Sequence, residues 1–242
     1  LGDVYKRQEN DYRDKYMKDY KSLENELFEE IKARIKEDDT SVPYLENGYY
    51  YYTRYEKGKQ YPIYCRKKDD LSNPEEILID ANKMSEGHEY FRIGGIDISP
   101  NNKIMAYSVD TVSRRLYTVN FKNLESGEES SHTISNTSGG VTWANDNKTI
   151  FYNQKNINTL RTERVMRHNL DIDKNDEEVF FEADDEFNLY SYKSKSGKYI
   201  MVVSGKTISD EISYISADNP YDCLLYTSDA ADERSSVDLG GR

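Results

Sequence analysis

The sequence predicts a mainly β fold: an incomplete β-propeller of about three and a half blades, preceded by an N-terminal α-helix. Runs of alternating apolar and polar residues recur along most of the chain and predict antiparallel strands. A unit of strand, polar turn ending in lysine, and strand occurs three times, with Lys103, Lys148 and Lys198 lying 45 and 50 residues apart. A period of about 40–50 residues with several strands per repeat is typical of propeller blades. This repeated turn favours a propeller over an irregular β-sandwich, whose strands also recur regularly.

Residues 9–38 are predicted to form the N-terminal helix. Apolar side chains follow one another there at spacings of three and four residues, among lysines and acids: Tyr16, Tyr20, Leu23, Leu27, Ile31 and Ile35. Pro43, just beyond this segment, prevents the helix from resuming. We interpret the apolar stripe as a face that packs on the rest of the same protein, and a partner-binding helix is the alternative.

The clearest blade pattern is the segment Ile96–Phe121, which predicts three strands joined by two turns. Ser99-Pro100-Asn101-Asn102 has turn chemistry, because proline presets φ and asparagine tolerates left-handed conformations. Ile104–Val109 is apolar on both faces, as in a strand covered on both sides, whereas Leu116–Phe121 alternates.

Residues 43–222 are predicted to contain the whole of the incomplete propeller. The first unit would hold the strands Gly48–Glu56, Pro62–Lys67 and Glu76–Asp80. The second unit would end near Thr137, the third would run from Gly139 to about Glu182, and a fourth would begin near Asn188.

The composition excludes several classes of partner. The 242 residues include 33 basic and 45 acidic side chains, a formal net charge of −12, so no nucleic-acid partner is expected. No apolar run is long enough to cross a membrane, and no membrane partner is expected. The 22 tyrosines argue against disorder, although 32% of the residues are charged. With Cys65 and Cys223 as the only cysteines, no disulfide framework is indicated.

The two ends are predicted to derive from sequencing adapters. Leu1–Gln8 (LGDVYKRQ) is a translation of the end of a common transposase adapter, and Cys223–Glu233 (CLLYTSDAADE) and Val237–Arg242 (VDLGGR) translate its partner. We therefore expect residues 1–8 and 223–242 to be artefacts, and the true N-terminus and everything after Asp222 to be missing. On this expectation, the lack of a leader sequence carries no information about location.

No catalytic centre is predicted within the chain. The sequence has no G-x-S-x-G nucleophile elbow and no Walker or dinucleotide fingerprint, and Gly139-Gly140 is too short for a phosphate loop. His88, His132 and His168 are far apart in the sequence and lack metal-ligand spacing. We interpret them as solvated or hydrogen-bonded side chains, and no metal or other cofactor is expected.

Longer motifs lie in order along residues 9–222, starting with Glu9-Asn10 and Tyr12 in the predicted helix. The others are Ser41-Val42-Pro43-Tyr44, Asn47-Gly48-Tyr49, Ile77–Lys83, His88-Glu89-Tyr90-Phe91, Gly94-Gly95, Ile98-Ser99-Pro100, Ser113-Arg114-Arg115, Asn123–Gly127 and Val141–Asp146. Together they resemble the oligopeptidase B group of the prolyl oligopeptidase family of serine peptidases.

This resemblance implies a seven-bladed propeller that caps an α/β-hydrolase domain. The complete enzyme, expected in the cytoplasm, would be a serine-type endopeptidase that cleaves short basic peptides after Arg or Lys. Its serine, histidine and aspartate would act as nucleophile, base and orienting group. All three would belong to the C-terminal domain, so the present chain would be an inactive fragment whose partner is that missing domain.

Two residues of the chain are candidate site residues by the same resemblance. Glu89 and Arg115 match family positions on the propeller face toward the catalytic domain, where charged pairs help to hold the closed state. An arginine suits this role because its guanidinium can bridge carboxylates with two hydrogen bonds. The alternative is that both are ordinary solvated charges at strand ends.

Two other functions remain open from the sequence. One is a propeller that serves only as a binding scaffold, and the other is a prolyl-specific peptidase of the same architecture. A G-x-S-x-G motif downstream in the uninterrupted gene would separate an enzyme from a scaffold. Turnover of Arg-terminated against Pro-terminated peptides would separate the two peptidases.

Overall fold

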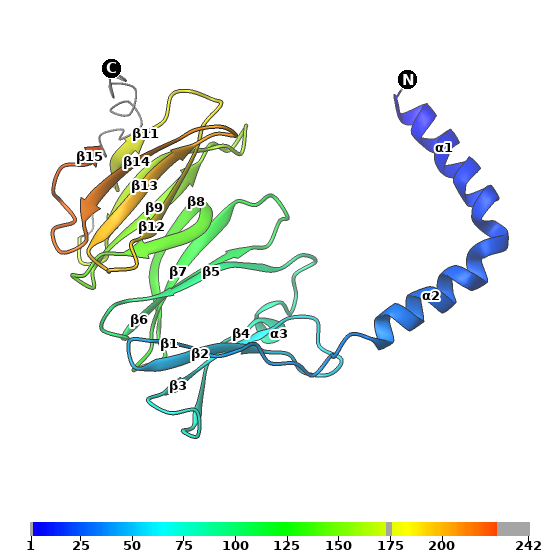
Figure 1. Cartoon of the computed structure of the whole chain (residues 1–242), viewed down its shortest axis with the longest axis horizontal. Helices are drawn as coiled ribbons and strands as arrows, with labels where there is room; N and C mark the ends of the chain where they lie inside the picture. Colours follow the sequence, from blue (N-terminus) through cyan, green and yellow to red (C-terminus); the bar gives the residue numbers. More distant parts are fainter. Residues whose placement is uncertain (1, 173–175, 227–242) are drawn as a thin grey trace, which may run out of the picture. The chain divides into compact units, whose positions relative to one another are not determined.

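The computed structural model describes residues 2–172 and 176–226, and it confirms a mainly β chain that begins with helices (Figure 1). The described strands form three sheets of four, seven and four strands. The chain divides into two compact units, residues 1–45 with 50–82 and residues 46–49 with residue 83 onward. Of the predicted adapter-derived ends, Leu1 and residues 227–242 lie outside the described residues.

The N-terminal helical segment begins earlier, and ends earlier, than predicted. It consists of α1 (Gly2–Met17), a 3-10 turn η1 (Lys18–Tyr20) and α2 (Lys21–Ala33). Beyond Ala33 the backbone hydrogen bonds join residues three apart instead of four, as in a 3-10 turn. They run from Arg34 N to Ile31 O and from Ile35 N to Lys32 O. These tighter bonds are the reason that α2 stops short of residue 38.

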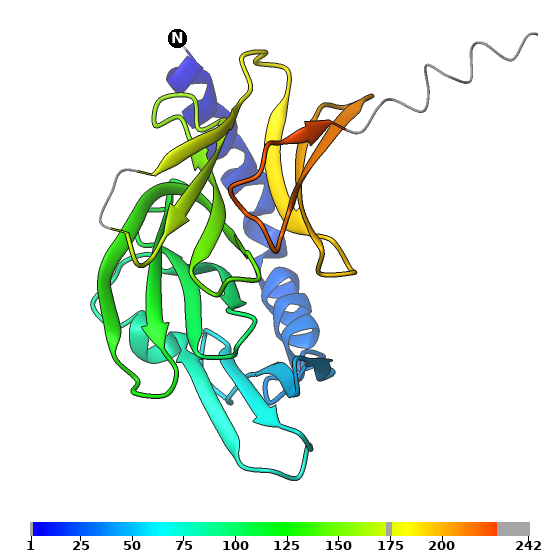
Figure 2. The same cartoon turned by 90° about the vertical axis from the view of Figure 1, so that its left-hand side faces the viewer.

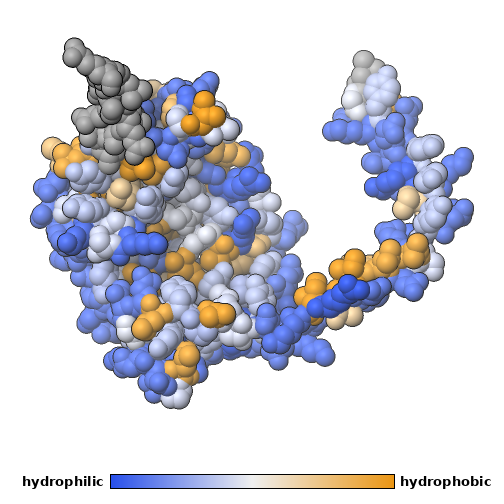
Figure 3. Space-filling model, in the orientation of Figure 1, coloured by the Kyte–Doolittle hydropathy of each residue, from blue (hydrophilic) through white to orange (hydrophobic). Residues whose placement is uncertain are grey.

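The apolar stripe lies on this helical segment as predicted, but the described chain does not cover it. Every described residue of α1, η1 and α2 is exposed, and Figure 3 shows apolar side chains running along α2. Within its own compact unit no described residue buries the stripe, and its packing on another part of the protein stays a prediction.

The first sheet contains the three predicted strands and a fourth, shorter one. It runs in the order β1 (Tyr44–Glu46), β2 (Tyr49–Arg54), β3 (Ile63–Lys68) and β4 (Glu75–Asp80), and the short helix α3 (Ala81–Met84) follows. Asn47 and Gly48 have φ angles of 46° and 80°, which make the tight turn between β1 and β2. Tyr52, Ile63 and Cys65 form the small buried core of this sheet.

The seven-stranded sheet contains two blades that share one long strand. Its strands are β5 (Arg92–Ile98), β6 (Ile104–Asp110), β7 (Tyr117–Asn123), β8 (Glu129–Trp143), β9 (Thr149–Lys155), β10 (Thr162–Asn169) and β11 (Glu177–Phe181). The first part of β8 pairs with β7, and its last part pairs with β9. The register shifts between Thr137 and Val141, and Asn136 and Gly139 have φ angles of 60° and 100°. The predicted boundary between the second and third units therefore falls inside one bent strand.

The third sheet forms the fourth blade. It consists of β12 (Asn188–Lys193), β13 (Tyr199–Gly205), β14 (Asp210–Ser216) and β15 (Leu225–Tyr226). β15 lies in the predicted adapter-derived end, and the origin of that end stays a prediction. In Figures 1 and 2 this sheet lies beside β9 and β10, and contacts of β12 with β8, β9 and β10 confirm it.

The core lies between successive blades. Between the second and third blades, Val119 and Phe121 pack with Trp143 and Ile150. A second set of side chains fills the space between the third and fourth blades: Ala144, Phe151, Val165, Leu189, Ile200, Val202, Ile215 and Ala217. Face-to-face packing of four-stranded sheets in sequence order is the arrangement of a propeller.

The lysine turns that predicted the repeat have the same backbone structure in three blades. The residue before each lysine is left-handed, with φ of 62° at Asn102, 62° at Asn147 and 70° at Gly197. One backbone hydrogen bond of 2.8–2.9 Å closes each hairpin, from Ser99 to Ile104, from Ala144 to Thr149 and from Ser194 to Tyr199. Asparagine and glycine tolerate this conformation best, which is why the turn could be predicted from the sequence.

Candidate functional site

The structure brings Glu89 and Arg115 to the same end of one blade. β5 and β6 are antiparallel with Arg92 opposite Asp110. The loop before β5, which carries Glu89, therefore lies at the same end as the β6–β7 loop, which carries Arg115. The β9–β10 loop of the third blade lies beside the β6–β7 loop, since Lys155 contacts Arg115. We call this end of the second and third blades the hairpin end. The side chains of Glu89 and Arg115 are both exposed, and among the described residues no ion pair joins them.

The backbone at Arg115 is held firmly although its side chain is exposed. The buried carboxylate of Asp110 accepts hydrogen bonds from Val112 N at 2.9 Å and from Arg115 N at 2.8 Å. Arg115 itself is left-handed, with φ of 55°. Lys155 Nζ, on β9 of the next blade, donates to the Arg115 carbonyl at 3.0 Å. These hydrogen bonds fix the backbone of the loop at Arg115, from which the exposed guanidinium extends.

The hairpin end is basic on a chain that is acidic as a whole. Arg92, Arg114 and Arg115 are exposed there, and Lys155 is half-buried. Burial lowers the pKa of Lys155, and the neighbouring charge of Arg115 lowers it further. Both carboxylate oxygens of Asp110 are occupied by backbone N–H groups. The arginine side chains of the hairpin end are therefore available to bind an anionic group such as a carboxylate.

Two glycine pairs let the inner strands of the second and third blades approach closely. A Cβ on Gly95 would lie 2.8 Å from the carbonyl oxygen of Gly139, and a Cβ on Gly94 would lie 2.5 Å from the ring of Tyr117. Ser108 Oγ accepts from Gly95 N at 3.0 Å and donates to Gly139 O at 2.6 Å, so one hydroxyl bridges both strands. The Gly94-Gly95 motif is thus explained by packing.

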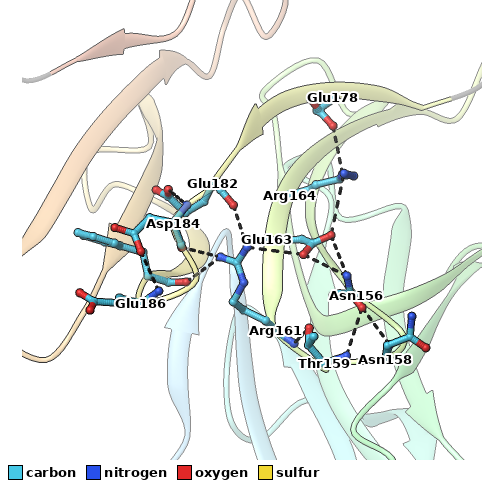
Figure 4. A network of polar contacts seen from close by, with 11 residues as sticks. Asn156, Asn158, Thr159, Arg161, Glu163, Arg164, Glu178, Glu182, Asp184 and Glu186 are labelled. Carbon is cyan, nitrogen blue, oxygen red and sulfur yellow. Dashed lines mark hydrogen bonds and ion pairs between the residues drawn. The ribbon is translucent and has the colours of Figure 1, made fainter.

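A second polar network holds the connection between the third and fourth blades (Figure 4). The half-buried guanidinium of Arg161 donates to the carbonyls of Asp184 at 2.9 Å, Phe187 at 3.0 Å and Glu182 at 2.9 Å. Its ion pair with Glu163 is 3.6 Å long. Because these acceptors are backbone groups, the network has a structural role. Arg161 was not among the residues predicted from the sequence, because nothing in its spacing indicates three carbonyl partners.

One face of the fourth blade is partly open. Leu189, Ile200 and Val202 of this sheet are buried against the third blade. On the alternating positions, the side chains of Tyr190 and Tyr192 are 47% and 43% exposed. Their rings stack on each other with centroids 6.2 Å apart. This sheet therefore has one packed face and one partly open face, on which Tyr190 and Tyr192 are exposed while Val203, opposite Tyr190, is buried.

A half-buried acid lies where the inner strand of the second blade ends. Burial raises the pKa of Asp97, at the end of β5, to about 7, and the nearby carboxylate of Glu46 adds to this effect. A hydrogen bond from Ile98 N at 3.0 Å and the charge of Lys193 oppose the shift. Burial also lowers the pKa of Lys193. Asp97 is thus an acid that titrates near neutral pH.

Two of the three histidines meet in the fold, which sequence spacing did not reveal. The rings of His132 on β8 and His168 on β10 have centroids 6.2 Å apart. His168 Nδ1 lies 2.6 Å from Asp176 Oδ1, and Tyr152 Oη donates to Asp176 Oδ2 at 2.5 Å. Burial alone would raise the pKa of Asp176, but hydrogen bonds from His168 and Tyr152 outweigh it and hold that pKa below its usual range.

The described part of the chain contains neither a cluster of metal ligands nor a membrane-spanning helix. No group of three or more His, Cys, Asp or Glu side chains in residues 2–172 and 176–226 is arranged to hold a metal. None of the helices in that part of the chain is long and apolar enough to span a bilayer.

The sequence and the structure are similar to the propeller domains of known peptidases. The family model of the prolyl oligopeptidase N-terminal beta-propeller domain matches residues 4–240. The chain is 36% identical over 234 residues to dipeptidyl aminopeptidase BI of Pseudoxanthomonas mexicana, with 90% of this chain and 32% of that protein covered. It is 30% identical over 238 residues to protease 2 of Moraxella lacunata, with 94% and 34% covered.

Two solved structures resemble the whole described propeller part. Oligopeptidase B from Leishmania major superposes with a TM-score of 0.80 at 28% identity and covers 89% of this chain and 31% of its own. The closed form of oligopeptidase B from Trypanosoma brucei, with covalently bound antipain, gives a TM-score of 0.79 at 26% identity, with 93% and 32% covered. The chain thus spans about a third of the length of these relatives.

Proposed function

Because the chain belongs to the prolyl oligopeptidase family, as its N-terminal β-propeller domain, we propose that it is the propeller part of a serine oligopeptidase that cleaves short peptides after Arg or Lys. The observation that carries this proposal is the similarity of nearly the whole described chain to two oligopeptidase B structures. The 242 residues match the propeller domain of this family, so in this proposal the peptidase chemistry belongs to a separate catalytic domain. The cytoplasmic location expected from the sequence belongs to the same proposal.

The chain by itself would be an inactive fragment. Its partly open tyrosine face on the fourth blade supports this, because a closed propeller covers each blade with the next one. The sequence contains no G-x-S-x-G motif, so the nucleophile would come from the α/β-hydrolase domain. In this proposal the propeller caps that domain and limits access to peptides short enough to enter.

A second activity is favoured by one observation. The identity to a dipeptidyl aminopeptidase, at 36%, exceeds the 30% identity to protease 2. The complete protein would then remove dipeptides from a free N-terminus instead of cleaving after an internal Arg or Lys. The two activities share the triad chemistry and differ in how the substrate's N-terminus is bound.

The experiment compares substrates of the complete enzyme, restored from the uninterrupted gene. An N-terminally blocked chromogenic peptide ending in Arg is the oligopeptidase substrate, and a dipeptide with a free amino group is the aminopeptidase substrate. A Pro-terminated peptide serves as the third arm. Turnover of the blocked Arg peptide supports the proposal, whereas turnover of only the free dipeptide or only the Pro peptide contradicts it.

Glu89 and Arg115 would act at the contact with the catalytic domain. Their place at one exposed, basic end of a blade supports this, because charges at that end are free to pair with a partner domain. Losing one member of a partly desolvated charge pair costs about 1–3 kcal/mol, and losing a screened exposed pair costs close to nothing. A shift of about 1.4 kcal/mol in the open–closed equilibrium changes apparent affinity up to about tenfold.

Kinetics of the complete enzyme test this role. Arg115→Ala and Glu89→Gln are expected to raise KM for an Arg-terminated peptide and to leave kcat nearly unchanged. High salt is expected to reduce the difference from the unmodified enzyme, since it screens the pair. Arg114→Ala, an equally exposed neighbour, is the control. If all three variants have unchanged KM at low salt, Glu89 and Arg115 are solvated charges without this role.

A further inference from the structure

The β6–β7 loop, residues 111–116, carries two neighbouring exposed arginines. Arg114 and Arg115 are both exposed, and Val112 in the same loop is 65% exposed. Exposed loop tips are the preferred sites of proteolytic nicking in folded proteins. A peptidase of trypsin-like specificity selects the basic side chain before the cleaved bond with an acidic pocket. By side chain and exposure alone, this loop is therefore a substrate for such a peptidase, and its backbone decides whether it can be cleaved.

The backbone of the loop has the wrong conformation for cleavage. A peptide bound along the edge of a peptidase active site is extended and pairs its backbone like an added strand. Extended residues have φ angles of about −60 to −160°. Ser113 and Arg115 have φ angles of 60° and 55°, in the left-handed region that residues with a Cβ adopt only occasionally. The loop must therefore open at both residues before it can lie in an active site.

Asp110 opposes this opening from inside the second blade. Its carboxylate, on a residue only 1% exposed, accepts hydrogen bonds from Val112 N at 2.9 Å and from Arg115 N at 2.8 Å. Arg115 N is also the nitrogen of the Arg114–Arg115 peptide bond. An extended loop would take both N–H groups away and leave a buried charge without these partners, which is strongly unfavourable. The closed loop is therefore the stable form.

Lys155 holds the other side of the same residue from the third blade. This half-buried lysine lies at the end of β9, and its Nζ donates to the Arg115 carbonyl at 3.0 Å. Cleavage of the Arg115–Leu116 bond requires that carbonyl oxygen to enter an oxyanion hole, where hydrogen-bond donors stabilise the transition state. In the folded chain an ammonium of the neighbouring blade already binds the oxygen. Leu116 is half-buried and leads directly into β7, which restricts access further.

We propose that Arg114-Arg115 is a masked cleavage site for peptidases that cut after arginine, and that Asp110 and Lys155 mask it. Hydrolysis after Arg115 would break the bond between its carbonyl carbon and Leu116 N. Water would supply the hydroxyl of the new carboxyl group and the proton of the new amine. The proposal rests on the proposed function for its purpose, because an enzyme that cleaves after Arg would carry this dipeptide on its own surface.

Limited proteolysis of the 242-residue chain with trypsin tests the mask. Because trypsin is added from outside, the result does not depend on the specificity of the protein's own catalytic domain, and the two proposals can fail separately. Mass spectrometry gives the position and initial rate of each cut. In the parent chain, trypsin is expected to cut the helical segment, residues 2–33, which is exposed throughout, and to leave the bonds after Arg114 and Arg115 intact.

Asp110→Asn and Lys155→Met are expected to raise the initial rate of cleavage after Arg115 about 10- to 100-fold. Proteolysis of a transiently opened segment follows the population of its open form, and one hydrogen bond to a charged group changes that population by about this factor. Lys206→Met is the matched control, because Lys206 is a half-buried lysine of the fourth blade that pairs with Glu186 at 3.2 Å. It is expected to leave the rate after Arg115 unchanged.

Cleavage after Lys122, which is half-buried within β7, reports whether a variant has unfolded the whole blade. If this cleavage rises in Asp110→Asn, Lys155→Met carries the test, because its position is half-buried and its side chain keeps a similar length. Three results overturn the proposal. They are cleavage after Arg115 in the parent chain as fast as in residues 2–33, a rise in Lys155→Met no larger than in Lys206→Met, and an equal rise after Lys122 in Lys155→Met.

Discussion

Adding one methyl group at Gly95 is expected to destabilise the junction between the second and third blades. The Cβ of alanine there would lie 2.8 Å from the carbonyl oxygen of Gly139, about 0.6 Å inside the 3.4 Å at which ordinary contact begins. That carbonyl cannot move away freely, because Ser108 Oγ donates to it at 2.6 Å. Gly140 is the matched control, since nothing lies within 4 Å of a Cβ at that position.

The expected magnitude follows from two opposing effects. Overpacking a well-packed site costs about 1–3 kcal/mol. Replacing glycine by alanine also reduces the entropy of the unfolded chain, which stabilises by about 0.4–1 kcal/mol where the backbone allows it. Gly95→Ala should therefore lower the free energy of unfolding by about 1–2 kcal/mol, and Gly140→Ala should leave it unchanged or raise it slightly.

Urea unfolding followed by tryptophan fluorescence measures the local transition at this junction, so it does not require the whole chain to unfold in one step. The chain has a single tryptophan, Trp143, which is 2% exposed and packs at the same blade junction. With a urea dependence of about 1–3 kcal/mol per molar, Gly95→Ala should lower the midpoint by about 0.3–2 M. Equal midpoints for Gly95→Ala and Gly140→Ala would refute the close-approach argument.

Three further predictions concern pH, the open blade and the ends of the chain. The pKa of Asp97 is about 7 in the folded state and about 3.9 in the unfolded state. Between about pH 4 and pH 7, Asp97 is therefore protonated in the folded chain and ionised in the unfolded chain. The stability of the junction should therefore fall as pH rises from about 4 to about 7, and Asp97→Asn should remove this dependence; equal pH profiles of the urea midpoint would contradict it. With a partly open blade face, the chain should aggregate readily and unfold without one sharp transition, and a cooperative melt of a soluble monomer would count against an incomplete propeller. Recloning from adapter-free source DNA should find neither residues 1–8 nor residues 223–242 in this frame, and recovery of either end would disprove the adapter origin.

Local chemistry made much of the fold predictable. The left-handed residues before Lys103, Lys148 and Lys198 are Asn102, Asn147 and Gly197, whose tolerance of that conformation is intrinsic to the residue type. The alternation in β7 likewise gives its burial pattern, with Tyr117, Val119 and Phe121 on the packed face. Each of these features depends on a few consecutive residues, and the sequence therefore displays it directly.

Features that depend on pairing between distant segments could not be predicted. The single strand β8 spans two blades because Asn136 and Gly139 bend it while pairing continues on both sides, yet its Ser-Asn-Thr-Ser-Gly-Gly run resembles a turn in the sequence. The contact between His132 and His168 depends on the register of two blades. For the candidate site, the resemblance named Glu89 and Arg115, and the register of β5 with β6 places both at one end.

The uninterrupted gene sequence tests the central claim most directly, namely that this propeller caps the catalytic domain of a serine oligopeptidase. The account predicts that the reading frame continues beyond Asp222 through further blades to a G-x-S-x-G motif, followed by the aspartate and histidine of a triad in that order. A frame that closes the propeller and then stops, or continues into a domain without that motif, would contradict it.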